Sequence, residues 1–206
     1  MRVSRIVVAG VAVATALTVS VAGCGGKPKS STSTSASATS ATSSPSSAST
    51  SAAPVQPGKY DGLLIQASDI NAPVAFTGVP PTQNPNGQPG IATTFRDEDG
   101  SHVIKDTIQV LADPTAATNA LNAAKDEKHS ALKNPKTQSA NVGTDGTTLS
   151  GNLPDDSKGV TVLLFTEGNA FVTLEFEGPA NVAAPSDFVN DVGQKQDAAI
   201  KKGLGG

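Results

Sequence analysis

The sequence predicts an α+β domain in which one antiparallel sheet carries two helices on one face, a two-layer arrangement. Two observations lead to this fold class. A hairpin pattern followed by a helical pattern spans 91–132, and the same order returns over 160–202 with a similar length. Strands joined by short polar turns pair antiparallel, so both segments can contribute to one sheet. The chain is therefore expected to contain repeated hairpin–helix units.

The first unit starts with a strand over 91–96, turns through Asp97-Glu98-Asp99-Gly100, and returns over 102–112. Alternate residues of the returning strand share one face. They are Ile104, Asp106, Ile108 and Val110. Asp106 is the polar exception on this face, which is otherwise suited to the core.

A helix is expected next, because Asp113 suits the N-cap position and Pro114 suits the first helical turn. The helix ends before Asn134-Pro135, since proline disfavours helical geometry in the preceding residue. Its apolar residues recur at helical spacing and are mostly small: Ala117, Ala120, Leu121, Ala124, Ala131 and Leu132. Such a narrow, alanine-rich stripe means that the helix lies close to the surface on which it packs.

The second unit contains the strongest strand pattern of the chain. Residues 160–166 are almost continuously apolar, which predicts a central strand covered on both faces or at its middle. After a turn at 167–169, residues 170–177 alternate strictly. The inner face of this strand carries Val172, Leu174 and Phe176. A last helix begins at a capping Ser186 and is stopped by Gly203.

The last helix carries an apolar stripe formed by Phe188, Val189, Val192, Ala199 and Ile200. Consecutive elements of such a domain usually pack together. We therefore expect Phe176 and Leu174 of the preceding strand to contact Phe188 and Val192. The outer face of that strand is expected to be solvated, and it carries Thr173, Glu175 and Glu177.

Three further stretches flank these units. Residues 63–65 predict either a short strand or the approach to a one-turn helix capped at Ser68. Residues 79–90 contain four prolines and two glycines, which excludes regular structure and indicates either a binding loop or a surface connector. One strand is expected near 147–150, between the two units.

The first 23 residues have the features of an export signal. Two arginines precede an apolar segment over 6–19 that is too short to span a bilayer core. The segment ends in Val21-Ala22-Gly23-Cys24, which resembles the lipobox of bacterial lipoproteins. That resemblance implies cleavage between Gly23 and Cys24 and a diacylglyceryl group on the cysteine sulfur. An ordinary export signal followed by an incidental cysteine is the alternative.

We divide the chain into a lipoprotein signal peptide over 1–23, a lipidated Cys24 with a stalk over 24–58, and a globular domain over 59–206. Between Ser30 and Ser51, 17 of 22 residues are Ser or Thr. Such a segment cannot bury enough apolar area to fold, so it predicts a disordered stalk. The composition fits an O-glycosylated stalk and an unmodified spacer equally well.

Composition restricts the possible partners. Without the predicted signal the chain has 13 basic and 18 acidic residues, a net charge of −5. This balance argues against nucleic-acid binding. Cys24 is the only cysteine, so no disulfide can form within the chain. We expect a monomer attached to the outer face of the cytoplasmic membrane, in the cell envelope, through the lipid on Cys24.

The sequence predicts no catalytic residue, metal ligand or cofactor. His102 and His129 are the only histidines, and each is expected to be solvated, since a zinc site needs more His or Cys ligands. Asp97-Glu98-Asp99-Gly100 suggests calcium, but a hairpin turn explains it better. Glu175 and Glu177 suggest paired acid–base carboxylates, but a solvated strand face explains them better.

Several phrases of the sequence resemble known proteins. The lipobox, the Ser/Thr stalk and the small α+β domain together resemble secreted lipoproteins of mycobacteria and related actinobacteria. Gly62-Leu63-Leu64 with Asp69-Ile70-Asn71, and residues 189–197, add to this resemblance. The first phrase is also similar to the start of the extracellular sensor domain of PknH-type receptor kinases. Neither resemblance brings a catalytic motif.

Three classes of function remain. The first is a binding or interaction module of the cell envelope, tethered to the membrane, with an envelope protein or lipid as its partner. The second is a carrier that holds a lipid or another apolar molecule in a cavity between sheet and helices; a core poor in aromatic residues argues against a large cavity. The third is an enzyme of unknown type.

Overall fold

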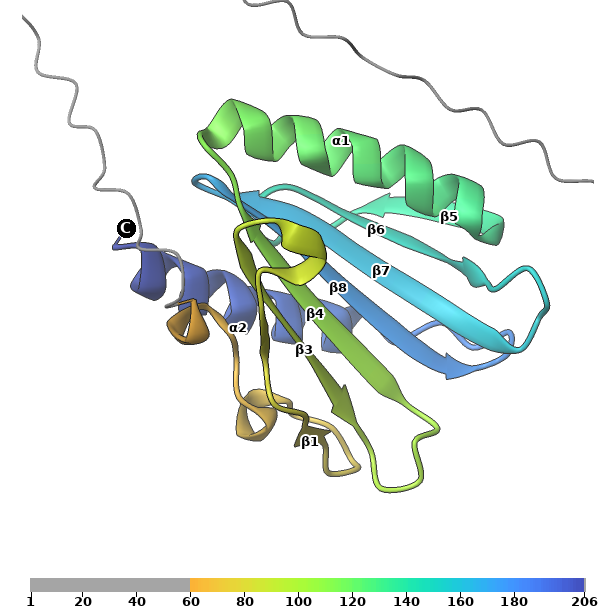
Figure 1. Cartoon of the computed structure of the whole chain (residues 1–206). Coiled ribbons are helices and arrows are strands. Elements are labelled where there is room, and N and C mark those ends of the chain that lie inside the picture. Colours follow the sequence, from red (N-terminus) through yellow and green to blue (C-terminus); the bar gives the residue numbers. More distant parts are fainter. Residues whose placement is uncertain (1–59, 206) are drawn as a thin grey trace, which may run out of the picture. The chain divides into compact units, whose positions relative to one another are not determined.

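The computed structural model describes residues 60–205, which form one domain (Figure 1). The predicted signal peptide, the cleavage site between Gly23 and Cys24, and the stalk lie outside the described residues. None of the helices within 60–205 is long and apolar enough to cross a membrane.

The domain combines eight strands with two long helices and three short 3-10 helices. The strands are β1 (Thr77–Gly78), β2 (Thr82–Gln83), β3 (Gly90–Arg96), β4 (Val103–Val110), β5 (Lys133–Ser139), β6 (Thr144–Asn152), β7 (Lys158–Glu167) and β8 (Ala170–Pro179). The long helices are α1 (Pro114–Ala131) and α2 (Ser186–Leu204). The 3-10 helices are η1 (Asp61–Leu63), η2 (Ala67–Asp69) and η3 (Pro85–Gly87).

All strands belong to one antiparallel sheet in the order β1-β3-β4-β8-β7-β6-β5, with β2 also paired to β3. Four pairs of consecutive strands form hairpins in it: β3–β4, β5–β6, β6–β7 and β7–β8. Helix α1 carries the chain from the central strand β4 to the far edge strand β5, and the following strands return to the centre beside β4. The α+β class and the two hairpin–helix units are thus confirmed, with an additional hairpin between them.

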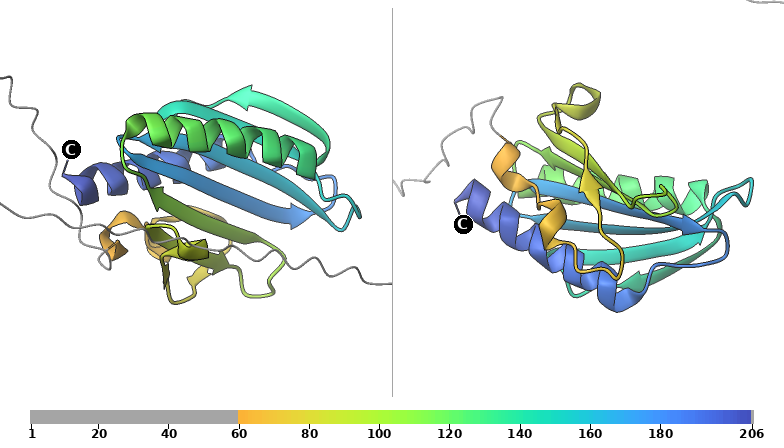
Figure 2. Two further views of the ribbon diagram at one scale, coloured as in Figure 1. Left: turned by 45° about the horizontal axis from the view of Figure 1, so that its top comes forward. Right: turned by 90° about the horizontal axis from the view of Figure 1, so that it is seen from below.

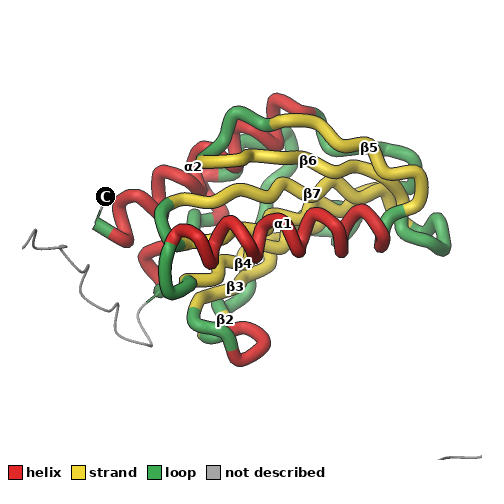
Figure 3. Tube along the Cα trace, turned by 90° about the horizontal axis from the view of Figure 1, so that it is seen from above, coloured by secondary structure: helices red, strands yellow, loops and turns green. Residues whose placement is uncertain are grey.

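The expectation that both helices lie on one face is wrong. Figure 2 (right) shows α2 on the near side of the sheet and α1 on the far side, and Figure 3 shows α1 in front with α2 behind. The domain therefore has three layers rather than two. The reason lies in β7, whose residues 159–166 are all buried. A strand with both faces buried needs a cover on each side, which was one of the two interpretations of its apolar run.

Each face of the sheet has its own apolar cluster. Under α2, side chains such as Leu163 and Phe165 pack with Val192 and Ile200. Under α1, the alternate residues of the same strand pack with the helix. This smaller cluster consists of Ala117, Leu121, Leu132, Leu149, Val160, Val162, Leu164 and Phe171.

The predicted contact between the last strand and the last helix is confirmed. The rings of Phe176 and Phe188 meet edge to face, with centroids 5.7 Å apart. Leu174 and Val192 are fully buried in the same cluster. Aromatic pairs in this geometry add to the stabilisation that burial alone provides. The alternation over 170–177 was therefore assigned to the correct face.

Helix boundaries agree with the sequence at α1 and differ at α2. Asp113 caps α1, because its Oδ1 accepts a hydrogen bond of 2.8 Å from the amide of Ala116. Ser186 does not cap α2; it is the first helical residue, after Pro185. Gly203 does not stop the helix either. The helix runs to Leu204 and ends at Gly205, which adopts a left-handed conformation at φ 76°.

Residues 60–76 pack along α2 instead of forming a strand. The buried Gln196 accepts a hydrogen bond from the amide of Ile65 at 3.2 Å and donates one to the carbonyl of Leu63 at 2.6 Å. The short helix η2 has Gln66 at its N-cap, not Ser68. The two phrases at 62–71 and 189–197 that resemble known lipoproteins are thus packed against each other.

Sequence patterns were less informative for the edges of the sheet. The strand expected near 147–150 is the longer β6, and its partner β5 was not predicted, because β5 is polar and almost fully exposed. The stretch 79–90 is not wholly irregular. Within it, β2 pairs with β3 and η3 forms one turn, so the stretch shields an edge of the sheet.

Candidate functional site

An apolar groove lies where the sheet, the start of α2 and two irregular segments meet. Its volume is about 420 Å³. The floor is formed by Ile104, Phe176 and Phe188, and one wall by residues 71–76. The loop between β8 and α2 forms the other wall. The walls are almost wholly apolar, and polar side chains occur mainly at the rim.

Regular elements place the floor of this groove. Ile104 and Phe176 are direct neighbours in the register of β4 and β8, so their side chains stand side by side on the α2 face. Phe188, in the first turn of α2, closes the inner end through its contact with Phe176. The floor is therefore built on packed elements and is pre-formed.

The wall between β8 and α2 is held by side chains of neighbouring strands. Asn152 donates from Nδ2 to Oδ1 of Asn181 at 2.7 Å, and the amide of Asn181 donates back to Asn152 Oδ1 at 3.0 Å. The amide of Ala184 donates to Thr161 Oγ1 at 3.1 Å. These bonds fix the loop, yet Val182 at its tip is 56 % exposed. An exposed valine on a fixed loop offers apolar surface to a ligand.

A compact polar cluster stands at the rim, in the turn between β3 and β4. Asp97 is buried, and its Oδ2 accepts hydrogen bonds from Ser101 Oγ at 2.9 Å and from His102 Nδ1 at 2.8 Å. Its Oδ1 accepts from the His102 amide at 3.1 Å. Burial alone would raise the pKa of Asp97, but these bonds outweigh it and lower the pKa to about 2. The carboxylate is therefore ionised and holds the imidazole in one orientation.

That orientation directs the other edge of the His102 ring toward the groove. His102 lines the groove together with Gly178. A Cβ atom placed on Gly178 would lie 3.6 Å from His102 Cδ2 and 4.0 Å from Nε2. The ring thus packs over the glycine, with Nδ1 turned to Asp97 and the Cδ2–Nε2 edge turned to Gly178. His102 was expected to be solvated, and its side chain is about half exposed.

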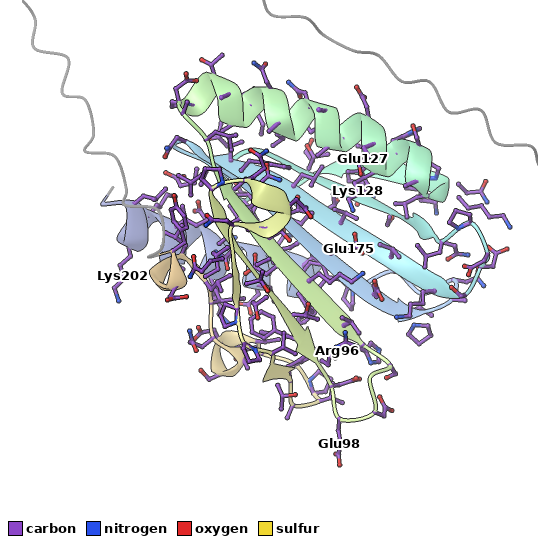
Figure 4. All side chains as sticks on the ribbon, in the orientation of Figure 1. Arg96, Glu98, Glu127, Lys128, Glu175 and Lys202 are labelled. Atoms are coloured by element: carbon purple, nitrogen blue, oxygen red, sulfur yellow. The ribbon has the colours of Figure 1, made fainter. Side chains whose placement is uncertain are left out.

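The opposite face of the sheet carries a network of ion pairs. Glu175 bonds Lys105 at 3.0 Å and Lys128 of α1 at 2.8 Å, and Glu177 bonds Lys105 and Lys158. Figure 4 shows Lys128 on the side of α1 that faces the sheet, near Glu175. Only 16 % of the Glu175 side chain and 9 % of the Glu177 side chain are exposed. The expectation that this face is simply solvated is wrong, because α1 and the lysine stems cover it.

These ion pairs have an electrostatic consequence. Partial burial alone would raise the pKa of Glu177, but hydrogen bonds from Lys105 and Lys158 hold that pKa below its usual range. Glu177 is therefore not placed as the neutral acid that a paired acid–base mechanism needs.

Asp106, the polar exception of β4, faces the α2 cluster and is fully buried. Neither of its carboxylate oxygens has a hydrogen-bond partner within the described domain. Burial raises the pKa of Asp106 to about 8. The residue lies beyond the floor of the groove and does not line it.

The remaining candidates are not brought together. His129 is exposed on α1, far along the chain from the groove. The acidic turn closes the β3–β4 hairpin as expected, with Gly100 at φ 71° and Glu98 at its tip (Figure 4). Among residues 60–205 no three His, Cys, Asp or Glu side chains gather as a metal site. Cys24 lies outside the described residues.

A second hollow, of about 490 Å³, lies between η1, η2 and the last turns of α2. Two of its three charged residues, Lys195 and Asp69, are already engaged. Lys195 donates to Asp191 and to the carbonyl of Asp69, while the Asp69 carboxylate caps the amide of Gln66. The hollow offers less apolar enclosure than the groove, so we regard the groove as the candidate site.

Comparison with solved structures bears on the fold. No protein-family model matches the chain, and no curated protein matches it. The structure is similar to the extracellular domain of PknH from Mycobacterium tuberculosis, with a TM-score of 0.54 and 10% identity. The similarity covers 75% of this chain and 100% of that one. It shows a shared fold, as the phrase at 62–71 suggested, while the lipoprotein assignment stays a prediction.

Sequence reasoning did not identify the groove. Two of its walls come from residues 71–76 and 180–185, which have no strand or helix pattern. One signal was available in the sequence. Each segment contains proline and an apolar residue, Val74 or Val182, that no strand or helix pattern explains. The segment 79–90, considered as a binding loop, does not line the groove.

Proposed function

We propose that this chain is a membrane-anchored envelope lipoprotein whose exported domain is a binding module for a small amphiphile. The apolar groove beside the first turn of α2 carries this proposal. Its volume lies within the range of about 300–1,000 Å³ that is typical of small-molecule sites. Such sites combine mostly apolar walls with a few placed polar groups, as this groove does.

The ligand is proposed to lie at the end of the sheet and not between the sheet and the helices. Helix α2 approaches the sheet closely at Gly193, where a Cβ atom would lie 2.4 Å from Leu163 Cδ2. This contact leaves no space for a ligand between α2 and the sheet at Gly193. The carrier hypothesis, with a cavity in the sheet–helix core, is therefore less well supported than a groove-based module.

Two observations support attachment outside the cytoplasm. The lipobox ending in Cys24 is typical of exported proteins anchored by acyl chains. The protein of similar fold is an extracellular domain. We propose that the described domain has the same location and is tethered through Cys24.

The binding proposal can be tested with an uncharged fluorescent probe, N-phenyl-1-naphthylamine, titrated into the chain from residue 24 carrying Cys24→Ser. Val182→Glu places a charge at the exposed mouth of the groove and should weaken probe binding at least tenfold. Val79→Glu is a matched control, because Val79 is 42 % exposed and does not line the groove. Equal affinities in the two variants would contradict a binding site in the groove.

Anchoring can be tested independently by expression of the full chain in an actinobacterial host. The processed protein should partition into the detergent phase, whereas Cys24→Ala should remain in the aqueous phase. Persistence of the Ala variant in the membrane fraction would contradict acylation at Cys24.

A further inference from the structure

We infer that the amphiphile carries a hydroxyl group, which donates a hydrogen bond to His102 Nε2 while the apolar part fills the groove. His102 would then determine which head group the site accepts. This inference rests on the proposed function, because it concerns the polar end of the same site.

The first step concerns Nδ1, the ring nitrogen of His102 that already contacts Asp97. His102 Nδ1 lies 2.8 Å from Asp97 Oδ2. The carboxylate already accepts from the His102 amide and from Ser101 Oγ, and it is held in the ionised form. An ionised carboxylate can only accept, so Nδ1 must carry the proton. In the neutral imidazole the proton-free nitrogen is then Nε2, which is an acceptor.

The second step concerns the direction of Nε2. The ring edge carrying Nε2 packs over Gly178, which lines the groove. Because Asp97 and Ser101 hold Nδ1, rotation of the ring away from this position would break both contacts. The lone pair of Nε2 is therefore presented at the mouth of the groove as a fixed acceptor.

The third step excludes the other charged group near this end. Glu177 also lines the groove, but its carboxylate bonds Lys105 and Lys158 on the opposite face of the sheet. Val103, Pro179 and Val182 add apolar lining, and Asn71, on the wall formed by residues 71–76, is the other uncharged polar residue of the groove. A hydroxyl is the simplest uncharged head group that matches a single acceptor at the rim of an apolar site.

The acceptor should produce measurable selectivity. A site built around a hydrogen bond discriminates against an analogue that lacks the matching group, because its own polar atom is left unpaired. His102 is about half exposed, so water can partly replace the ligand. We therefore expect a factor of about 5–10 rather than the several orders of magnitude found for fully buried polar contacts.

The test compares two probes that differ by one methyl group, 2-(octyloxy)ethanol and its methyl ether. Each displaces N-phenyl-1-naphthylamine from the chain starting at residue 24 with Cys24→Ser. The titration is done at pH 8. The alcohol should bind about 5–10 times more tightly than the ether. His102→Phe keeps an aromatic ring over Gly178 and should abolish this preference without loss of ether binding.

Asp97→Asn provides a second variant, which keeps the imidazole ring and moves its proton. The asparagine carbonyl can accept from the His102 amide while its NH₂ group donates to Nδ1. Nε2 would then carry the proton and become a donor, so the preference for the alcohol over the ether should disappear. Nitrogen-15 NMR of the His102 ring reports the proton position directly and should show protonated Nδ1 in the parent and protonated Nε2 in the variant.

The outcomes separate the two proposals. If alcohol and ether displace the probe equally from the parent chain, the role of His102 is overturned while the groove remains a binding site. If the ring is protonated at Nε2 in the parent, the inference is also overturned. If neither compound displaces the probe and Val182→Glu does not weaken it, the proposed function fails as well.

Discussion

The two faces of the sheet are built from alternate residues of the same strands, yet they differ in kind. The α2 face has the larger apolar cluster, covered by α2 and by residues 60–76, and it carries the groove. The α1 face has a smaller cluster beneath one helix and, beside it, the ion pairs of Glu175 and Glu177. On β8, Phe176 and Glu175 are adjacent residues that belong to these two different environments.

The difference follows from how each face is covered. Helix α1 packs on β6, β7 and β8 as it crosses to the far edge, so charged and polar side chains fill the surface beside it. The α2 face is covered by two segments instead of one, and the groove lies where they diverge. A strand pattern therefore indicates which residues share a face, but the cover on that face depends on where distant segments cross.

The largest effect is expected from truncation in the α2 cluster. Phe176→Ala removes a ring that is 4 % exposed together with its contact to Phe188, and should cost about 3–5 kcal/mol in the free energy of unfolding. Phe171→Ala, equally buried on the α1 face of the same strand, is the matched comparison and should cost less. Urea denaturation measures both. A larger loss for Phe171→Ala would reverse the proposed ranking of the two faces.

Asp106, the buried carboxyl of the α2 face, should make the free energy of unfolding depend on pH. Its pKa rises from the ordinary 3.8 to about 8 on folding, so the folded state retains a proton that the unfolded chain releases. The contribution of this group to the free energy of unfolding is therefore greatest below about pH 4 and falls as the pH rises toward 8. Between pH 5 and pH 8 we expect a loss of about 3 kcal/mol, which Asp106→Asn should remove.

Asp156 is the control for this experiment, because it is exposed and its pKa is lowered instead of raised. The main cause of the lower pKa is a hydrogen bond from Lys133. The contribution of Asp156 to the free energy of unfolding is complete above the ordinary pKa of an aspartate and is lost only in acid. Asp156→Asn should therefore leave the slope between pH 5 and pH 8 unchanged. An unchanged slope in Asp106→Asn would show that Asp106 is ionised in the folded protein.

Removal of a charge from the α1 face should have a smaller effect. Glu175→Ala leaves Lys128 without its partner, and we expect a loss of about 1 kcal/mol, because this network is partly covered by α1. The loss should shrink in 1 M salt, which screens such pairs. A loss under about 0.3 kcal/mol at low salt would mean that the network behaves as an ordinary solvated surface.

The smallest effect is expected at the far edge of the sheet, where β5 lies under neither main cluster. Lys133 pairs with Asp156, and both side chains are nearly half exposed. Lys133→Ala should change the free energy of unfolding by less than about 0.5 kcal/mol. The result for Lys133→Ala is the baseline for the Glu175→Ala result. If both variants lose the same free energy of unfolding, the distinction between a covered and an exposed ion pair is wrong.

Local patterns in the sequence were sufficient for much of the fold. The alternation over 170–177 and the Asp113-Pro114 signal identify β8 and the start of α1, because their physical causes lie within a few residues. The unbroken apolar run over 160–166 contained the information that both faces of β7 are covered, although it also fitted a strand covered at its middle. The two-layer prediction followed from giving both helices the same face.

Other features depend on contacts between distant residues. Strand β5 has no apolar alternation, because it is held in the sheet mainly by its pairing with β6. The groove depends on the meeting of 71–76 with 180–185, more than 100 residues apart. The polar role of His102 depends on Asp97 and on Gly178, a residue from another strand. None of these relationships is visible in a window of neighbouring residues.

Helix α2 also separates the point where the chain enters the domain from the groove. The chain joins the domain at Tyr60, and η1 packs beside Gly203 at the C-terminal end of α2, whereas the groove lies at its N-terminal end. The helix has 19 residues and is therefore about 28 Å long. The point of attachment and the mouth of the groove are separated by about this distance. The chain therefore enters the domain at the end of α2 opposite to the mouth of the groove.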